Sequence, residues 1–131
     1  MLMLDTNICI YVLKRRPTEV LEKFNAAGEL HISSIVCAEL WAGVEQSPPE
    51  FQALRREQLE LFLSLLTIIA WDEATAQEYA ICYTTLKQQG QLIGNMDLLI
   101  AAHAKSLNAT LVTNNTREFE RIAGLKLENW V

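Results

Sequence analysis

Three carboxylates in this chain of 131 residues adjoin long apolar segments, where charged side chains are rare. Asp5 follows the apolar run at residues 1–4, and Glu39 is the only charged residue in the segment 35–42. Asp97 stands immediately before an apolar stretch that begins at Leu98. An unpaired carboxylate is costly to bury, so each of these acids needs a hydrogen-bond donor, a cation or water beside it.

Each acid also has a purely structural explanation. Asp5 can cap the helix that follows it, and Asp97 lies in a first helical turn, capped by Asn95, where the helix dipole favours an anion. Glu39 can face solvent along a narrow stripe of its helix. Taken together, however, the three acids predict an all-oxygen site for a hard divalent cation such as Mg²⁺ or Mn²⁺. Such a site polarises a phosphodiester and activates a water molecule for attack on it.

The segments around these acids alternate between strand and helix character. Short apolar segments predict strands at residues 2–4, 30–33, 67–70 and 110–113, with a weaker fifth at 126–128. Helical patterns occupy residues 6–14, 18–27, 34–46, 49–66, 72–89 and 96–107, with Thr18 and Asp72 as expected caps. The alternation predicts the α/β class, as an α/β/α sandwich with a central parallel sheet of four to five short strands. We expect a single domain over residues 1–131.

The carboxyl ends of the strands are where ligands bind in open sheets of this kind. Asp5, the pair Ser33-Ser34 and the segment 113–115 all follow predicted strands directly. We therefore expect these residues to meet at one edge of the sheet.

Composition narrows the class of protein further. Half of the residues are hydrophobic and 21% are charged, which suits a folded core and excludes disorder. The net charge of −5 excludes a general cationic coat for nucleic acid but allows a local basic patch. No apolar run is long enough for a membrane span, and the first residues lack the features of a signal peptide. Cys9, Cys37 and Cys82 are scattered and indicate reduced thiols, so we expect a cytoplasmic protein with no membrane partner.

Other polar residues form less specific patterns. His103 stands among alanines and is expected to be a packed, hydrogen-bonded side chain, while His31 lies within a predicted strand. The basic run at residues 14–16 either ends a helix in solvent or grips phosphate groups. The arginines that would join it in a phosphate-binding patch are Arg55, Arg56, Arg117 and Arg121.

The helix predicted at residues 49–66 carries more large apolar side chains than one small core needs. Together with the neighbouring Trp41, it predicts a face for a partner protein or a second copy of the chain. We expect the three tryptophans to be core or interface residues rather than platforms for stacked bases.

The acids and their flanking residues resemble the motifs of PIN-domain proteins, and in particular of the VapC toxins. The matching blocks are residues 3–7 around Asp5, residues 33–40 around Glu39, residues 93–104 around Asp97, and the tail at 111–122 with Glu128-Asn129-Trp130. Four blocks in this order make the resemblance specific, and it covers essentially the whole chain.

The resemblance implies a metal-dependent endoribonuclease that acts as the toxin of a type II toxin–antitoxin pair. Asp5, Glu39 and Asp97 match the positions that hold Mg²⁺ or Mn²⁺. The fourth acidic position of the family is occupied here by Asn115, with Glu118 one turn later, so either of these two would contact the metal through water. All five residues are therefore candidates for the catalytic site.

The resemblance also implies partners. Family members are usually homodimers, and a VapB-type antitoxin inserts a C-terminal segment into the active-site groove. The implied substrate is a structured RNA, with initiator tRNA as one member of that class, and its cleavage would stop translation and growth. Thr6 and Thr113 are placed to orient the neighbouring carboxylates through their hydroxyl groups.

Two other functions remain open at this point. One is a catalytically inactive PIN-like module that regulates transcription with a DNA-binding partner, although such a module has no need for three clustered acids. The other is a small Mg²⁺-dependent phosphatase. The chain has no Gly-rich phosphate loop, and Asp5-Thr6 lacks the second aspartate of an aspartyl-phosphate enzyme.

Overall fold

Five short strands form one parallel sheet in the computed structural model, which describes residues 1–131. The strands are β1 (Leu2–Leu4), β2 (Leu30–Ser33), β3 (Thr67–Ile69), β4 (Thr110–Val112) and β5 (Lys126–Glu128). Their order across the sheet is β3-β2-β1-β4-β5, and every neighbouring pair is parallel. The predicted α/β class with a central parallel sheet is confirmed.

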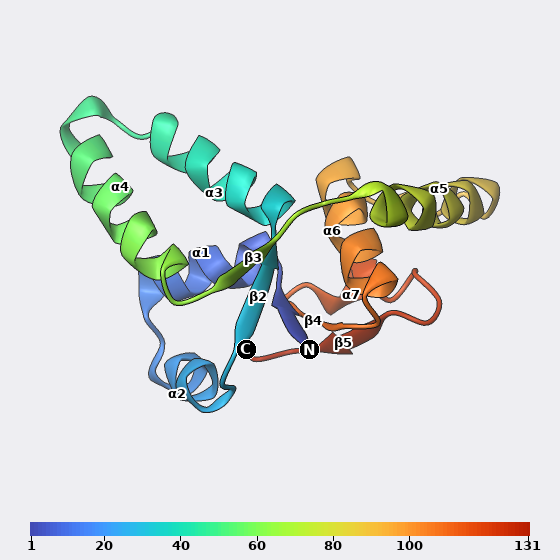
Figure 1. Ribbon diagram of the computed structural model, residues 1–131, viewed down its shortest axis with the longest axis horizontal. Helices are drawn as coiled ribbons and strands as arrows, with labels where there is room; N and C mark the ends of the chain where they lie inside the picture. Colours follow the sequence, from blue (N-terminus) through green and yellow to red (C-terminus); the bar gives the residue numbers. More distant parts are fainter.

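Seven helices flank this sheet. They are α1 (Thr6–Arg15), α2 (Thr18–Ala26), α3 (Ser34–Glu45), α4 (Pro49–Leu63), α5 (Glu73–Gln88), α6 (Asn95–Ser106) and α7 (Thr116–Phe119). Figure 1 shows α3 and α4 as a helical pair that projects from the sheet on one side, with α5 and α6 packed together on the other side. No helix is both long and apolar enough to cross a membrane.

The core follows from the strand order. The three central strands carry side chains that are almost completely buried, such as Leu4, Ile32 and Leu111, because both faces of these strands are covered. The edge strands β3 and β5 are mostly exposed, although two of the three residues of β3 are isoleucines. One cluster of 25 buried hydrophobic residues joins the strands to the helices.

Two expected helix caps were wrong, and two other local features were not predicted. Pro17, and not Thr18, occupies the cap position of α2, and Gly94, and not Asn95, occupies that of α6. The short helix α7 was not predicted, because four residues carry no readable period. Helix α3 is buried on one face only, since it leaves the sheet to pair with α4 and its outer face, including Ala38, stays exposed.

Candidate active site

Asp5 lies at the carboxyl end of β1 and is almost fully buried. Its Oδ1 accepts a hydrogen bond from the Ile8 backbone N–H at 2.8 Å, so Asp5 does cap α1. Its Oδ2 accepts a hydrogen bond from the Thr113 hydroxyl at 2.5 Å, at the end of the adjacent strand β4. Burial raises the pKa of Asp5, the two hydrogen bonds oppose that rise, and the nearby Glu39 adds to it.

Glu39, on α3, lies beside Asp5 at this edge of the sheet. Its Oε1 accepts a hydrogen bond of 2.6 Å from the hydroxyl of Thr6, the residue that follows Asp5. The side chain is half-buried, so it lies on neither the buried nor the fully exposed face of its helix. The expected orientation of two carboxylates by Thr6 and Thr113 is confirmed.

Asp97 lies in the first turn of α6. Partial burial, followed by the negative charges of Glu118, Asp5 and Glu39, raises the pKa of Asp97 to about 6. A hydrogen bond shared with Glu118 contributes to the same rise. Glu118, Asp5 and Glu39 therefore lie close enough to Asp97 for their charges to disfavour its ionised form.

Asn115 is held near this cluster by its backbone, whose N–H donates to the Thr113 hydroxyl at 2.9 Å. Its side-chain amide is half-exposed and bonds to none of the four acids. Of the two candidates for the fourth position, only Glu118 is among the groups that raise the pKa of Asp97.

The four acids have no protein cation to balance them. The ion pairs of the molecule are His31–Glu29, Arg56–Glu45 and Lys105–Glu78, none of which includes a site residue. No three Asp, Glu, His or Cys side chains form a preassembled metal cage either. The donors nevertheless suit Mg²⁺ or Mn²⁺, because they are all oxygen atoms and because Mg²⁺ retains several water ligands and needs only one or two carboxylates.

The histidines and cysteines form no hydrogen bond or ion pair with the four acids. His103 is buried and its Nδ1 lies 2.8 Å from the Ser33 hydroxyl, as expected for a packed, hydrogen-bonded residue. His31 is also buried, with Nδ1 3.2 Å from the Leu2 carbonyl. All three cysteines are free, and burial raises the pKa of the Cys9 thiol well above its usual value, which keeps that thiol protonated.

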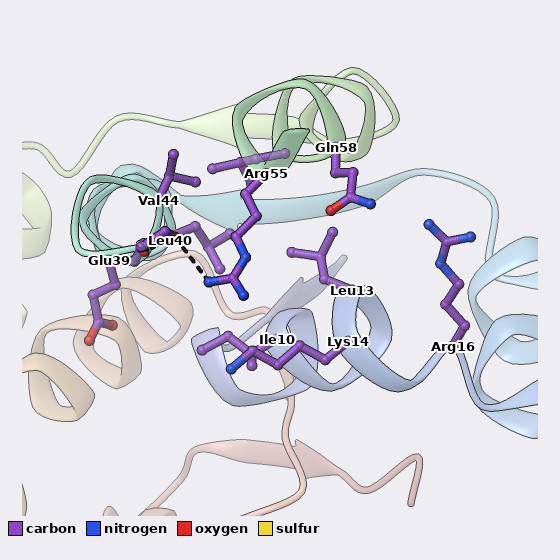
Figure 2. A pocket seen from close by; sticks show the side chains of 12 residues that line it. Ile10, Leu13, Lys14, Arg16, Glu39, Leu40, Val44, Arg55 and Gln58 are labelled. Carbon is purple, nitrogen blue, oxygen red and sulfur yellow. Dashed lines mark hydrogen bonds between the residues drawn. The ribbon is translucent and has the colours of Figure 1, made fainter. Parts of the chain in front are cut away.

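A groove of about 650 Å³ leads away from the acids between α1, α3 and α4. Figure 2 shows Glu39 at one end and Arg16 at the other, with Arg55 reaching in from α4. The floor is apolar and the rim is cationic. The lining residues are Ile10, Leu13, Lys14, Arg16, Glu39, Leu40, Gly43, Val44, Ser47, Arg55, Gln58 and Leu59.

The groove gathers part of the predicted basic patch. Lys14, Arg16 and Arg55 line it, and none of the three forms an ion pair. Arg56 instead pairs with Glu45 and lies over the Trp41 ring, and Arg121 donates to the Leu92 carbonyl.

Comparison with known proteins places this arrangement in a family. The PIN-domain family matches residues 2–125. Ribonuclease VapC2 of Haemophilus influenzae is 49% identical over 130 residues, covering 98% of this chain and 97% of the relative. The tRNA(fMet)-specific endonuclease VapC of Shigella flexneri is 42% identical over 129 residues, covering 98% and 96%.

Among solved structures, the VapBC2 complex of Rickettsia felis, bound to a DNA fragment from its promoter, contains a chain that superposes with a TM-score of 0.95. That chain is 44% identical, and the match covers 99% of this chain and 98% of the other. A parallel sheet flanked by helices, with acidic residues at its carboxyl edge, is the fold of a PIN domain, and the matched relatives are named as nucleases. This chain belongs to the PIN-domain family and, within it, to the VapC ribonucleases.

Proposed function

We propose that this protein is a divalent-metal-dependent endoribonuclease and the toxin of a VapBC-type toxin–antitoxin pair, acting in the cytoplasm as one domain over residues 1–131. The observation that carries the proposal is the meeting of Asp5, Glu39, Asp97 and Glu118 with no protein cation among them. Such a cluster is poorly suited to an inactive binding module, because mutual repulsion raises the cost of folding without a cation.

Asp5, Glu39 and Asp97 would hold the metal, Mg²⁺ or Mn²⁺, and Asn115 or Glu118 would contact it through water. When bound, the metal supplies a polarised phosphodiester and a water molecule of lowered pKa. The protein's own contribution is orientation. Thr113 and the Ile8 N–H fix both oxygens of Asp5, and Thr6 fixes one oxygen of Glu39. These bonds leave the acids little rotamer freedom to lose when a metal ion arrives.

The proposed substrate is structured RNA, with tRNA as the class favoured by the relative from Shigella flexneri. A protein with a net charge of −5 cannot hold RNA by a general positive field. The groove supplies a local positive field instead. It is lined by the unpaired cations Lys14, Arg16 and Arg55, and it ends near Glu39.

The proposed partner is a VapB-type antitoxin, by analogy with the VapBC complexes among the solved structures. Its inhibitory segment would lay apolar side chains on the groove floor and offer an arginine to the carboxylates, which bind guanidinium well. The sequence pattern pointed to Trp41 for this contact, but Trp41 does not line the groove, whereas its neighbour Leu40 does. A homodimer is also part of the proposal, since exposed apolar residues such as Ile81 and Leu61 lie outside the groove.

The direct test is cleavage of total tRNA by the purified protein. Cleavage should require added Mg²⁺ or Mn²⁺, stop with EDTA, and be absent from a matched preparation of Asp5→Asn. Cleavage that persists in EDTA, or in Asp5→Asn at the wild-type rate, would refute a metal-dependent site at these acids.

A further inference from the structure

Two fully buried polar side chains join helices that the proposed mechanism treats separately. His103 of α6 is 1% exposed and Ser33, at the end of β2, is 0% exposed. The His103 Nδ1 and the Ser33 Oγ lie 2.8 Å apart, within hydrogen-bond distance, although 70 residues separate them in the chain. Neither side chain can touch RNA, because both are enclosed by protein.

Ser33 has a second role in the same place. It is the cap of α3, and its Oγ accepts a hydrogen bond from the Ile35 backbone N–H at 3.1 Å. A single hydroxyl group therefore ties the first turn of α3 to the side of α6.

Each of the joined helices carries one of the site acids. Glu39 lies six positions after Ser33, and Asp97 lies six positions before His103. Six helical residues span about 9 Å, so a shift or rotation at the shared bond moves both carboxylates relative to each other. Glu39 and Asp97 lie near enough to feel each other's charge, which means that their separation is sensitive to the angle between the two helices.

The histidine is not required to fill space. Its neighbours on α6, Ala102 and Ala104, are both fully buried, and an apolar side chain at this position would avoid the cost of burying an imidazole. A buried imidazole that donates to or accepts from a capping hydroxyl adds a directional constraint that an apolar side chain lacks.

We propose that His103 is a positioning residue, which acts through the Ser33 hydroxyl to set the separation of Glu39 and Asp97 and thereby the affinity of the site for its divalent cation. This inference rests on the proposed function, since it assumes that these acids hold the metal. It assigns His103 no contact with metal, water or RNA.

Mn²⁺ affinity of the purified, RNA-free protein is the primary measurement, with wild type and Asp5→Asn as the reference pair. His103→Leu removes the bond, and we expect Mn²⁺ binding to weaken about 10–100-fold, as for other residues that orient metal ligands. His103→Asn places an amide near the position of Nδ1 and should recover most of that loss. Ser33→Ala should weaken binding as well, and adding His103→Leu to it should cost little more, because both changes remove one bond.

Thr75→Val is the matched control. Thr75 is 1% exposed, and its hydroxyl lies 3.2 Å from that of Ser106, so it joins α5 to α6 without reaching α3. We expect Thr75→Val to lower the thermal midpoint while keeping wild-type Mn²⁺ affinity.

Four results would overturn the inference. They are wild-type affinity in His103→Leu, equal losses in His103→Asn and His103→Leu, additive losses from Ser33→Ala and His103→Leu, and a loss in Thr75→Val as large as that in His103→Leu. If His103→Leu does not fold, Ser33→Ala and His103→Asn still decide between the outcomes. Failure of the proposed function looks different, because wild type itself would then bind Mn²⁺ no better than Asp5→Asn.

Discussion

At the scale of single residues, Asp5 shows how one side chain can be structural and chemical together. One of its oxygens caps α1 through the Ile8 N–H, while the other is held by Thr113. The capping interpretation and the metal interpretation of Asp5 are therefore compatible. The capping bond also explains how a carboxylate can remain in so buried a position without metal.

The first prediction concerns the loss of one negative charge. Asp5→Asn and Asp97→Asn should each abolish RNA cleavage and growth inhibition while the fold is kept. The amide is nearly isosteric with the carboxylate, and its oxygen can still accept the capping bond at residue 5. Circular dichroism checks the fold and a cleavage assay with Mg²⁺ checks activity. Near wild-type cleavage by either variant would contradict the assignment.

The second prediction is a pH dependence of stability. Folding raises the pKa of Asp97 from 3.8 to about 6, so folding favours its protonated form. The stability gained from that proton is complete below pH 3.8 and is lost as the pH rises through about 6. Metal-free wild type should therefore become less stable relative to Asp97→Asn over this range.

Denaturant unfolding in EDTA measures this difference. Burial lowers the pKa of His103, so neutral His103 stabilises the fold and this stabilisation is lost on acidification. Because His103 is present in both proteins, its effect cancels in the difference between their unfolding free energies. If the difference in stability between wild type and Asp97→Asn does not change with pH, then neither burial nor the neighbouring acids raise the pKa of Asp97.

The third prediction ranks the remaining acids and the amide. Glu39→Gln should be severely impaired, because Glu39 is a proposed direct ligand. Asn115→Ala and Glu118→Gln should be intermediate, with losses of about 10–100-fold in metal affinity or cleavage rate, as is typical of outer-shell residues. Isothermal titration with Mn²⁺ gives the order, and a fully active Glu39→Gln would remove Glu39 from the site.

At the scale of helices and strands, the local sequence pattern predicted where the central strands lie, but not how the strands are ordered in the sheet. The apolar runs of β1, β2 and β4 were readable because each is short and directly followed by a polar residue at the sheet edge. Strand order was not readable, since nothing local to β1 states that β2 and β4 lie on either side of it.

The candidate site also has a part that the sequence predicted and a part that it did not. The three main acids stood out because they interrupt apolar segments, and the order of the motifs gave their grouping. The effect of Glu118 on the pKa of Asp97 and the bond between Ser33 and His103 could not be predicted, because each depends on how separate elements pack. The groove could not be predicted from the sequence either, because its lining combines side chains of three helices.

The fourth prediction tests the groove as the antitoxin surface. Leu13→Glu places a charge on the apolar floor, whereas Leu61→Glu places the same charge on α4 at a side chain that is 65% exposed and outside the groove. In pull-down with a VapB-type antitoxin that binds the wild-type protein, Leu13→Glu should lose most binding and Leu61→Glu should keep it. Circular dichroism should show the native fold for both variants, which separates partner binding from folding. Equal binding by the two variants would place the antitoxin elsewhere.

At the scale of the whole molecule, an acidic protein must act on a polyanion. The charge of −5 opposes RNA except where Lys14, Arg16 and Arg55 line the groove, and the proposed divalent cation would offset the charge of the four acids as phosphate approaches. RNA and antitoxin would then bind in the same groove. An antitoxin bound there would keep RNA out of the groove and would also occupy the acids.

The measurement that tests the central claim most directly is the sequencing of RNA 5′ ends after a brief pulse of expression, with wild type beside Asp5→Asn. The account predicts new ends at one or a few positions of a structured RNA, with tRNA as the first class to inspect. These ends should appear with wild type only and should disappear when the antitoxin is co-expressed. The same ends in Asp5→Asn, or no new ends with wild type, would contradict the claim that this acidic cluster cuts RNA.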